Sequence, residues 1–425
     1  MKKQKFRINM DLTIINKLRN TINENQNISI NKEFSKRIGK DIKKFNSWDI
    51  VCAIMDRIKD TCEYLNTLEL NTGEYTRSAF DFINFINNAM VVVDCVNDLA
   101  NVYDVSFKNE NKSTEIFKQI GKKGQGTDLK YFRYIRSLCS VHPNDTSRHS
   151  EYQDNDFECS PFVLWNNGIY SDDNDIHIVV YTSEVDKFPK NINLKIKDIF
   201  NFINYRYGLI KKIISAIESY QQEIIAQFKN RRINQPEEFK NYIEYLEYLK
   251  KEQNERLGDG MSDLLDYAIK VFKVKLSNEK NVKCLEKYKN VIKYAITFIH
   301  NEIQSLTREG YKNSGIKNNI SNGTLLDLIL YENNNTKEAN EYSYNIQKLE
   351  HLNYDSGYQN RQWGYQMLNE MLPLLEKYVT FENVYDSDES YVLANIALYF
   401  NSLEVECELN ANIPNDIMYR FNLKE

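Results

Sequence analysis

Glycine and proline are scarce in this chain of 425 residues, which contains 14 glycines and 6 prolines. Both residues interrupt helices and form tight turns, so their scarcity favours long helices over architectures with many turns. Apolar residues recur at helical spacing through most of the chain, for example at Val51, Met55, Ile58 and Cys62. We therefore expect a mainly α protein built as a helical bundle.

One stretch departs from this helical pattern. Residues 162–165 and 176–181 are runs of apolar and aromatic residues, and an Asn-Asn-Gly sequence begins between them at Asn166. Two such runs separated by turn-forming residues are typical of a hairpin. The sequence therefore predicts a small β-hairpin insertion at about residues 157–190.

A short polar break at residues 232–236 marks the best candidate for a domain boundary. It separates residues 1–232, a helical domain that carries the hairpin, from residues 233–425, where only helical patterns occur. No motif in the second segment points to a chemistry. We expect it to be a second all-helical domain, and the sequence assigns it no role.

Composition and cysteine usage favour a soluble cytoplasmic protein. Hydrophobic residues make up 42% of the chain and charged residues 27%, as in ordinary globular proteins. No run approaches the roughly 20 apolar residues that span a bilayer, and the basic first residues lack the apolar segment of a secretory signal. The seven cysteines are scattered without a Cys-x-x-Cys pair, so reduced thiols are expected.

Glycines at positions 121, 124 and 126 surround Lys122 and Lys123. No strand is predicted before them and no Gly-Lys-Ser/Thr follows, so a nucleotide-binding P-loop is excluded. A flexible linker is the simpler interpretation. No cysteine or histidine spacing matches a structural zinc site, and neither a metal nor a cofactor is expected.

The charge is distributed unevenly along the chain. The first 59 residues hold fourteen basic and six acidic side chains, whereas residues 381–425 hold two basic and nine acidic ones. This asymmetry points to a polyanionic partner or to self-association of opposite faces. An unevenly charged, solvated surface is the alternative.

The segment from Lys130 to Pro143 carries the most specific pattern. Arg136 and His142 are separated by five residues at the end of a helix predicted from Asp128 to about His142. This resembles the Arg-x(4–6)-His motif of HEPN superfamily ribonucleases, over about residues 40–230. The resemblance implies a homodimeric, metal-independent endoribonuclease of the toxin or anti-phage effector type. It makes Arg136 and His142 the catalytic residues, RNA the substrate and an antitoxin-like protein a further partner.

The chemistry of this pair suits RNA cleavage. RNA supplies its own nucleophile, the 2′-hydroxyl, so the protein needs a proton carrier and a cation. His142 fits the first role, since an imidazole commonly titrates near neutral pH. Arg136 fits the second, because its guanidinium is permanently charged and forked.

Neighbouring residues extend the candidate site. Phosphate contacts are expected from Lys122, Lys123, Lys130 and Arg133, and base stacking from Tyr134. The resemblance also implies a residue that orients the arginine. The candidates for that role are Asp94, Asp98 and Ser137.

Two observations keep other interpretations open. A helical wheel places His142 on the apolar face of its helix, where a structural histidine would lie. Eight acidic residues between Pro143 and Asp175 would repel RNA. One alternative is a non-catalytic helical protein that binds nucleic acid or a protein partner. The other is a regulatory or immunity partner whose acidic end mimics nucleic acid.

Overall fold

The computed structural model describes residues 4–24, 47–72, 75–141, 148–154, 158–160, 163–166, 172–182, 186–258, 263–307, 337–353, 358–382 and 386–403. The chain divides into two compact units, which we call unit 1, up to Glu223, and unit 2, from Ile224 onward. Helices dominate both units and strands form a minor part. The predicted fold class, mainly α with a small β insertion, is confirmed.

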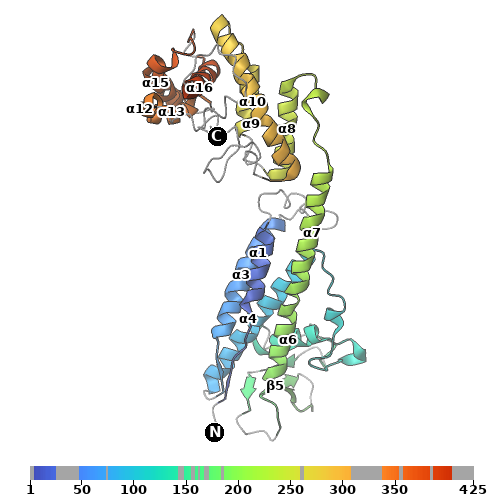
Figure 1. Cartoon of the computed structure of the whole chain (residues 1–425). Coiled ribbons are helices and arrows are strands. Elements are labelled where there is room, and N and C mark those ends of the chain that lie inside the picture. Colours follow the sequence, from blue (N-terminus) through green and yellow to red (C-terminus); the bar gives the residue numbers. More distant parts are fainter. Residues whose placement is uncertain are drawn as a thin grey trace, which may run out of the picture. The chain divides into compact units, whose positions relative to one another are not determined.

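Unit 1 contains a helical bundle and the β insertion. Its elements are β1 (Lys5–Phe6), α1 (Leu12–Asn23), α3 (Ser47–Thr67), β2 (Leu70–Asn71), α4 (Tyr75–Val102), the short 3₁₀ helices η1 (Glu110–Lys112) and η2 (Lys122–Gly124), α5 (Asp128–Arg136), the π-helix η3 (Ser137–Val141), β3 (Glu158–Cys159), β4 (Val163–Trp165), β5 (Ile176–Thr182), β6 (Lys190–Leu194), α6 (Ile196–Gly208) and the first part of α7 (Ile210–Asn230), whose last residues belong to unit 2. Figure 1 shows α1, α3 and α4 beside one another and β5 at the lower end of unit 1, and α6 packs against α4.

Helix α4 is the centre of unit 1. It packs against α3, α5, α6 and β4, and many of its apolar side chains are buried, for example Phe82, Phe85 and Val93, whereas Phe80 is exposed. Residues 77–102 are long and apolar enough to cross a membrane by length and composition, the only such stretch among the described residues, and 56% of the most apolar window is buried. Because its apolar face belongs to one continuous core with the neighbouring helices and strands, α4 is a core helix here.

The β insertion forms a sheet around β5. Strand β4 pairs antiparallel with β5 in the predicted hairpin, with Trp165 opposite Ile176. The sequence did not indicate β3 and β6, which pair with β5 as well. The sheet packs on α4 through Trp165, whose ring meets Phe82 edge-on at 5.9 Å and whose Nε1 donates to the Ser78 carbonyl oxygen at 3.1 Å.

The helix expected from Asp128 to His142 has a different geometry from the prediction. Thr127 caps it, accepting a hydrogen bond from the Lys130 N–H at 3.2 Å. Its α-helical part ends at Arg136, and the π-helix η3 covers Ser137–Val141. Single π-turns are rare and occur often at functional sites. A change of helical pitch directly after Arg136 is a tertiary effect that residue periodicity does not reveal.

The described part of unit 2 is entirely helical. Its elements are η4 (Pro236–Glu238), α8 (Tyr242–Leu257), α9 (Asp263–Lys273), α10 (Glu279–Ser305), α12 (Lys337–Glu341), α13 (Ser343–Lys348), α14 (Glu350–Asn353), α15 (Tyr358–Leu375) and α16 (Ser387–Leu403). Helix α10 packs against α8, α9 and α16. Among the described cysteines five are free thiols, whereas Cys284 on α10 is disulfide-bonded, so the expectation of reduced thiols is wrong for Cys284.

Candidate functional site

Arg136 is held by a single side chain from the central helix. Its Nε donates to Oδ1 of Asn87 on α4 at 3.2 Å, and the guanidinium is half-buried. The Ser140 hydroxyl lies 2.8 Å from the same Oδ1 and 2.9 Å from the Arg136 carbonyl oxygen. Asn87 therefore ties the end of α5 and the π-helix to α4.

No described residue accepts a hydrogen bond from Nη1 or Nη2 of Arg136. Those two groups form the outer side of the guanidinium fork, which matches the geometry of two phosphate oxygens. The anchored Nε fixes the plane of the fork, so less rotamer entropy is lost when an anion binds. Arg136 is therefore an oriented cation with two donors that its neighbours leave available.

The expected orienting residues occupy other positions. Asp94 pairs with Arg133 at 3.4 Å. Asp98 is exposed on α4, and its pKa is raised by partial desolvation and by the charge of Asp94. Ser137 is buried, and its N–H bonds back to the carbonyls of Arg133 and Tyr134 at the end of α5. Asn87 was not predicted as a site residue, because a single amide in an apolar helix has no evident function. The available signal was its position, since it is a polar residue on the side of α4 that faces α5.

His142 lies outside the described residues. The π-helix that precedes it ends at Val141. The helical wheel that placed His142 on the apolar face assumes 3.6 residues per turn throughout the helix. This assumption does not hold for Ser137–Val141, because η3 is a π-helix. Helical geometry therefore no longer assigns His142 to the apolar face.

Acidic residues after the motif neutralise two of the four expected phosphate-binding cations. Lys130 forms a 3.0 Å ion pair with Glu151, and Lys122 lies 4.0 Å from Asp154. Lys123 is exposed, and Arg133 is partly exposed beside Asp94. The acidic segment noted in the sequence thus pairs with neighbouring lysines, which reduces its repulsion of an anion.

Tyr134 is not available for base stacking, contrary to the expectation. Its side chain is 1% exposed, and its hydroxyl donates to Glu158 Oε2 at 2.6 Å. The ring stacks on Tyr152 at 5.5 Å between centroids with an interplanar angle of 19°. Burial and the adjacent carboxylate raise the pKa of Tyr134, so the hydroxyl stays protonated. Tyr134 holds the segment around Tyr152 against α5.

Three arginines lie along α4, each bonded to a different polar side chain of that helix. Asn87 accepts from Arg136, Asp94 pairs with Arg133, and Asn97 accepts from Arg206 of α6. Arg206 is 1% exposed, and burial lowers its pKa. It also donates to Asn111 at 2.8 Å, which fixes the α4–α5 connection to the bundle. Arg136 and Arg133 are the members of this row that reach the surface.

Arg136 lines neither of two cavities found among the described residues. One of them, about 370 Å³, lies between the end of α3 and the start of α4, and the residues around it include Tyr64, Glu69 and Asp81. Among the described residues no cluster of histidine, cysteine, aspartate or glutamate could hold a metal ion. An oriented cation outside these cavities suits a polymeric anion better than an enclosed small molecule.

The arrangement can therefore bind an anion at Arg136 and stabilise negative charge that develops there. No protein-family model matches this chain, and no curated protein or solved structure is significantly similar to it. The function must accordingly be argued from the residues around Arg136.

Proposed function

We propose that this protein is a HEPN-like, metal-independent endoribonuclease that cleaves RNA through Arg136 and His142. The observation that carries the proposal is the Asn87–Arg136 hydrogen bond, which orients the guanidinium while its Nη1 and Nη2 stay without a described partner. The π-turn between the two motif residues and the helical-bundle class are consistent with it. The Arg-x(5)-His spacing supplies the proton-carrying partner.

The reaction follows from the groups present. The 2′-hydroxyl oxygen of the substrate attacks the adjacent phosphorus as its proton leaves for a base, and the bond from phosphorus to the 5′-oxygen breaks. The departing oxygen takes up a proton, which gives a 2′,3′-cyclic phosphate and a 5′-hydroxyl. The imidazole of His142 carries a proton, and Arg136 stabilises the extra charge on the non-bridging oxygens.

A homodimer is part of this proposal. The general acid and the general base act on opposite sides of one phosphate, so the reaction needs two proton carriers. The chain contains a single Arg-x(5)-His motif. A second copy facing the first would supply the other imidazole and guanidinium. A cytoplasmic toxin or anti-phage effector role, controlled by a protein partner such as an antitoxin, belongs to the same proposal and derives from the HEPN resemblance.

The acidic-mimic alternative receives little support from the described part of the C-terminal segment. Glu382 accepts hydrogen bonds from Ser277 and Asn278, and Asp388 pairs with Lys270 at 2.5 Å. Most of α16 is buried. These carboxylates serve contacts within unit 2, whereas a mimic of nucleic acid presents its charges to a partner.

The test is cleavage of a labelled single-stranded RNA in EDTA by wild type and by variants. Arg136→Ala and His142→Ala should each lower the cleavage rate by about 10²–10³-fold without changing the melting temperature. Arg232→Ala, which removes an exposed arginine that pairs with Glu238 in unit 2, is the control and should keep most of the rate. Mass spectrometry should find 2′,3′-cyclic phosphate ends. Full activity of Arg136→Ala, or a requirement for added metal, would overturn the proposal, and RNA binding without cleavage would favour the non-catalytic binding protein.

A further inference from the structure

The connection between α4 and α5 is unusually rich in lysine. Residues 107–126, which we call the lysine loop, hold five lysines and two glutamates. Glu110 pairs with Lys212 of α7, so Glu115 is the loop's remaining acidic side chain. The lysines are Lys108, Lys112, Lys118, Lys122 and Lys123. Their charge is concentrated in a segment that leads directly into the helix carrying Arg136.

Hydrogen bonds hold the lysine loop in a defined conformation, so the prediction of a flexible linker is wrong. Asp128 is 3% exposed, and its carboxylate accepts hydrogen bonds from the Phe117 N–H and the Ser113 hydroxyl, both at 2.9 Å. The Gly126 N–H donates to the Ile120 carbonyl oxygen at 2.8 Å. These bonds fix the first and second halves of the loop separately.

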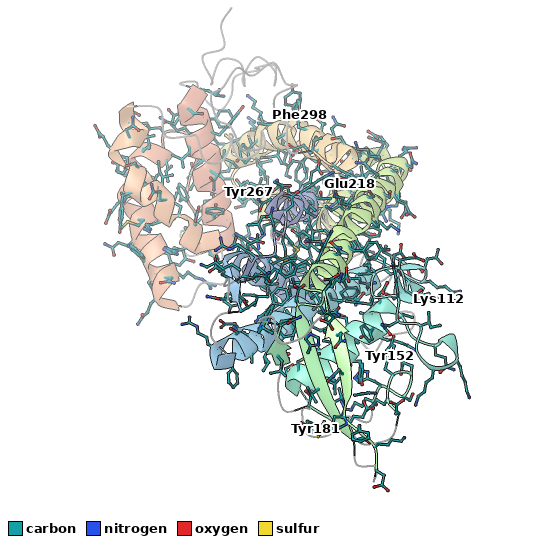
Figure 2. All side chains as sticks on the ribbon, turned by 90° about the horizontal axis from the view of Figure 1, so that it is seen from below. Lys112, Tyr152, Tyr181, Glu218, Tyr267 and Phe298 are labelled. Carbon is teal, nitrogen blue, oxygen red and sulfur yellow. The ribbon has the colours of Figure 1, made fainter. Side chains whose placement is uncertain are left out.

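The 148–154 segment closes over the second half of the loop. The Lys122 N–H donates to the Glu151 carbonyl oxygen at 2.7 Å, and the Thr127 N–H donates to the Tyr152 hydroxyl at 2.8 Å. A Cβ at Gly126 would lie 2.6 Å from that hydroxyl, so the backbone passes too close for any side chain. Figure 2 shows Tyr152 nearer the sheet and Lys112 toward the periphery.

Two of the lysines adopt a backbone conformation that lysine disfavours. Lys118 has φ 58° and Lys123 has φ 52°, both in the left-handed region. Lys118 donates its N–H to the Thr114 carbonyl oxygen at 3.0 Å and so ends a single helical turn, a position where glycine is usual. The same loop places glycine at other left-handed positions, 121 and 124. Backbone geometry alone therefore favours glycine at 118 and 123, and lysine there calls for a role of the side chain.

The charges of these side chains face solvent. Lys108, Lys112, Lys118 and Lys123 are exposed, and none of them forms an ion pair with a described residue. Lys122 differs because it lies near Asp154 and donates to the Gln153 carbonyl oxygen. Because the backbone of the loop is already fixed, these lysines attract an anion without a further cost of ordering the loop.

The loop and Arg136 share one scaffold. Arg206 bonds both Asn111 of the loop and Asn97 of α4, the helix whose Asn87 orients Arg136. The loop therefore has a fixed position relative to the proposed catalytic arginine. A polymer that extends from Arg136 toward the start of α5 would approach the positive charge of the loop, because Asp128 at that end bonds to Ser113 and Phe117.

We infer that the lysine loop binds the phosphate backbone of the RNA substrate, with Lys118 and Lys123 as two of its phosphate contacts. The inference rests on the proposed function for the identity of the anion. It assigns Lys118 and Lys123 to substrate binding and not to catalysis, since they act as point charges on phosphates away from the bond that breaks.

The test replaces both strained lysines by the residue that their backbone favours. Lys118→Gly/Lys123→Gly should leave the melting temperature unchanged or higher. It should weaken binding of a single-stranded RNA about tenfold at low salt and reduce the slope of log K against log salt by about 1.4, as expected for two lost phosphate contacts. A lower melting temperature would overturn the inference, because the lysines would then hold the loop together. Unchanged affinity and slope would overturn it as well.

Asp104→Gly is the matched control. Asp104 is exposed, has φ 54° and follows the end of α4, so glycine relieves the same kind of backbone conformation there while the charge removed is negative. Its RNA affinity should stay equal or rise. Binding is measured in an Arg136→Ala background, where cleavage does not interfere. If the loop variant binds RNA normally and cleavage still requires Arg136, the inference about the lysine loop is wrong and the proposed nuclease function stands. If the variant loses salt-sensitive RNA binding but no cleavage depends on Arg136, the proposed nuclease function is wrong and the binding role of the loop stands.

Discussion

Asn87 on α4 and Arg136 on α5 are joined by a 3.2 Å hydrogen bond from the guanidinium Nε to the amide Oδ1. The sequence motif identifies this arginine, and the hydrogen bond fixes the orientation of its guanidinium. Asn87 also lies 2.8 Å from the Ser140 hydroxyl, so the same amide fixes the π-turn that follows. One uncharged side chain thus positions both the cation and the start of the segment that leads to His142.

Replacement of Asn87 should separate positioning from folding. Asn87→Leu keeps the volume but removes the acceptor, and a freely rotating guanidinium should lower kcat about tenfold to a hundredfold with little change in KM. Asn87→Asp keeps an acceptor and should retain most of the rate. Single-turnover cleavage measures both. Asn88→Leu, the adjacent residue, whose amide bonds to Asn84, is the control and should cleave normally. Equal losses in both leucine variants would mean that general damage to α4 is the cause.

Tyr134→Phe should affect stability and not RNA binding. The change removes the hydroxyl that donates to Glu158 at 2.6 Å, and it leaves a carboxylate that is 1% exposed with one partner fewer. We expect the free energy of unfolding to fall by about 1–3 kcal/mol. Urea denaturation measures this, and RNA affinity is the second readout. Weakened RNA binding at unchanged stability would contradict the buried position of Tyr134.

Arg256→Met should strongly destabilise unit 2. Arg256 is fully buried, donates to Glu252 at 2.9 Å and caps the end of α7 through the carbonyl oxygens of Phe228 and Arg231 at 2.8 and 2.7 Å. Its loss breaks the buried ion pair, leaves Glu252 with Arg231 as its remaining cation and removes the donor to the Phe228 carbonyl oxygen, which costs roughly 3–5 kcal/mol. Chemical denaturation is the measurement. Arg232→Met, which breaks an exposed pair with Glu238, should cost less than about 1 kcal/mol.

His300 should make stability depend on pH. Burial first, and then the charges of Arg256 and Arg232, lower the pKa of His300 below its ordinary value of 6.5. The unfolded chain therefore takes up a proton as the pH falls through that ordinary value, while the folded protein keeps the ring neutral. Neutral His300 bonds the Tyr245 hydroxyl at 2.9 Å. Its contribution to stability is complete above pH 6.5 and is lost as the pH falls toward the folded-state pKa.

A His300→Gln variant isolates this effect. The urea midpoint of the wild type should fall more between pH 7.5 and pH 5.5, two values chosen about one unit either side of the ordinary histidine pKa, than that of the variant. The difference between the two proteins removes the contribution of carboxylates, which titrate in both. Parallel pH profiles would show that His300 is charged or solvated in the folded state.

Several features of the fold were readable from the residues because they depend on local pattern. Apolar spacing and the scarcity of glycine and proline indicated helices such as α4 and α16. Alternating apolar residues around Asn166 indicated the β4–β5 hairpin. The sequence also singled out Arg136, because an arginine and a histidine at that spacing are chemically informative.

The sequence by itself determined the mainly helical class, the β4–β5 hairpin and the choice of Arg136 as a candidate site residue. Only the tertiary structure decided that Asn87 and not Asp94 meets Arg136, that Tyr134 is buried against Glu158, and that the glycine-rich connection is a rigid lysine-bearing loop. The physical reason is distance along the chain. Periodicity reports which face of one element is apolar, whereas a hydrogen bond across 49 residues depends on how two elements pack, and packing is set by all their neighbours together.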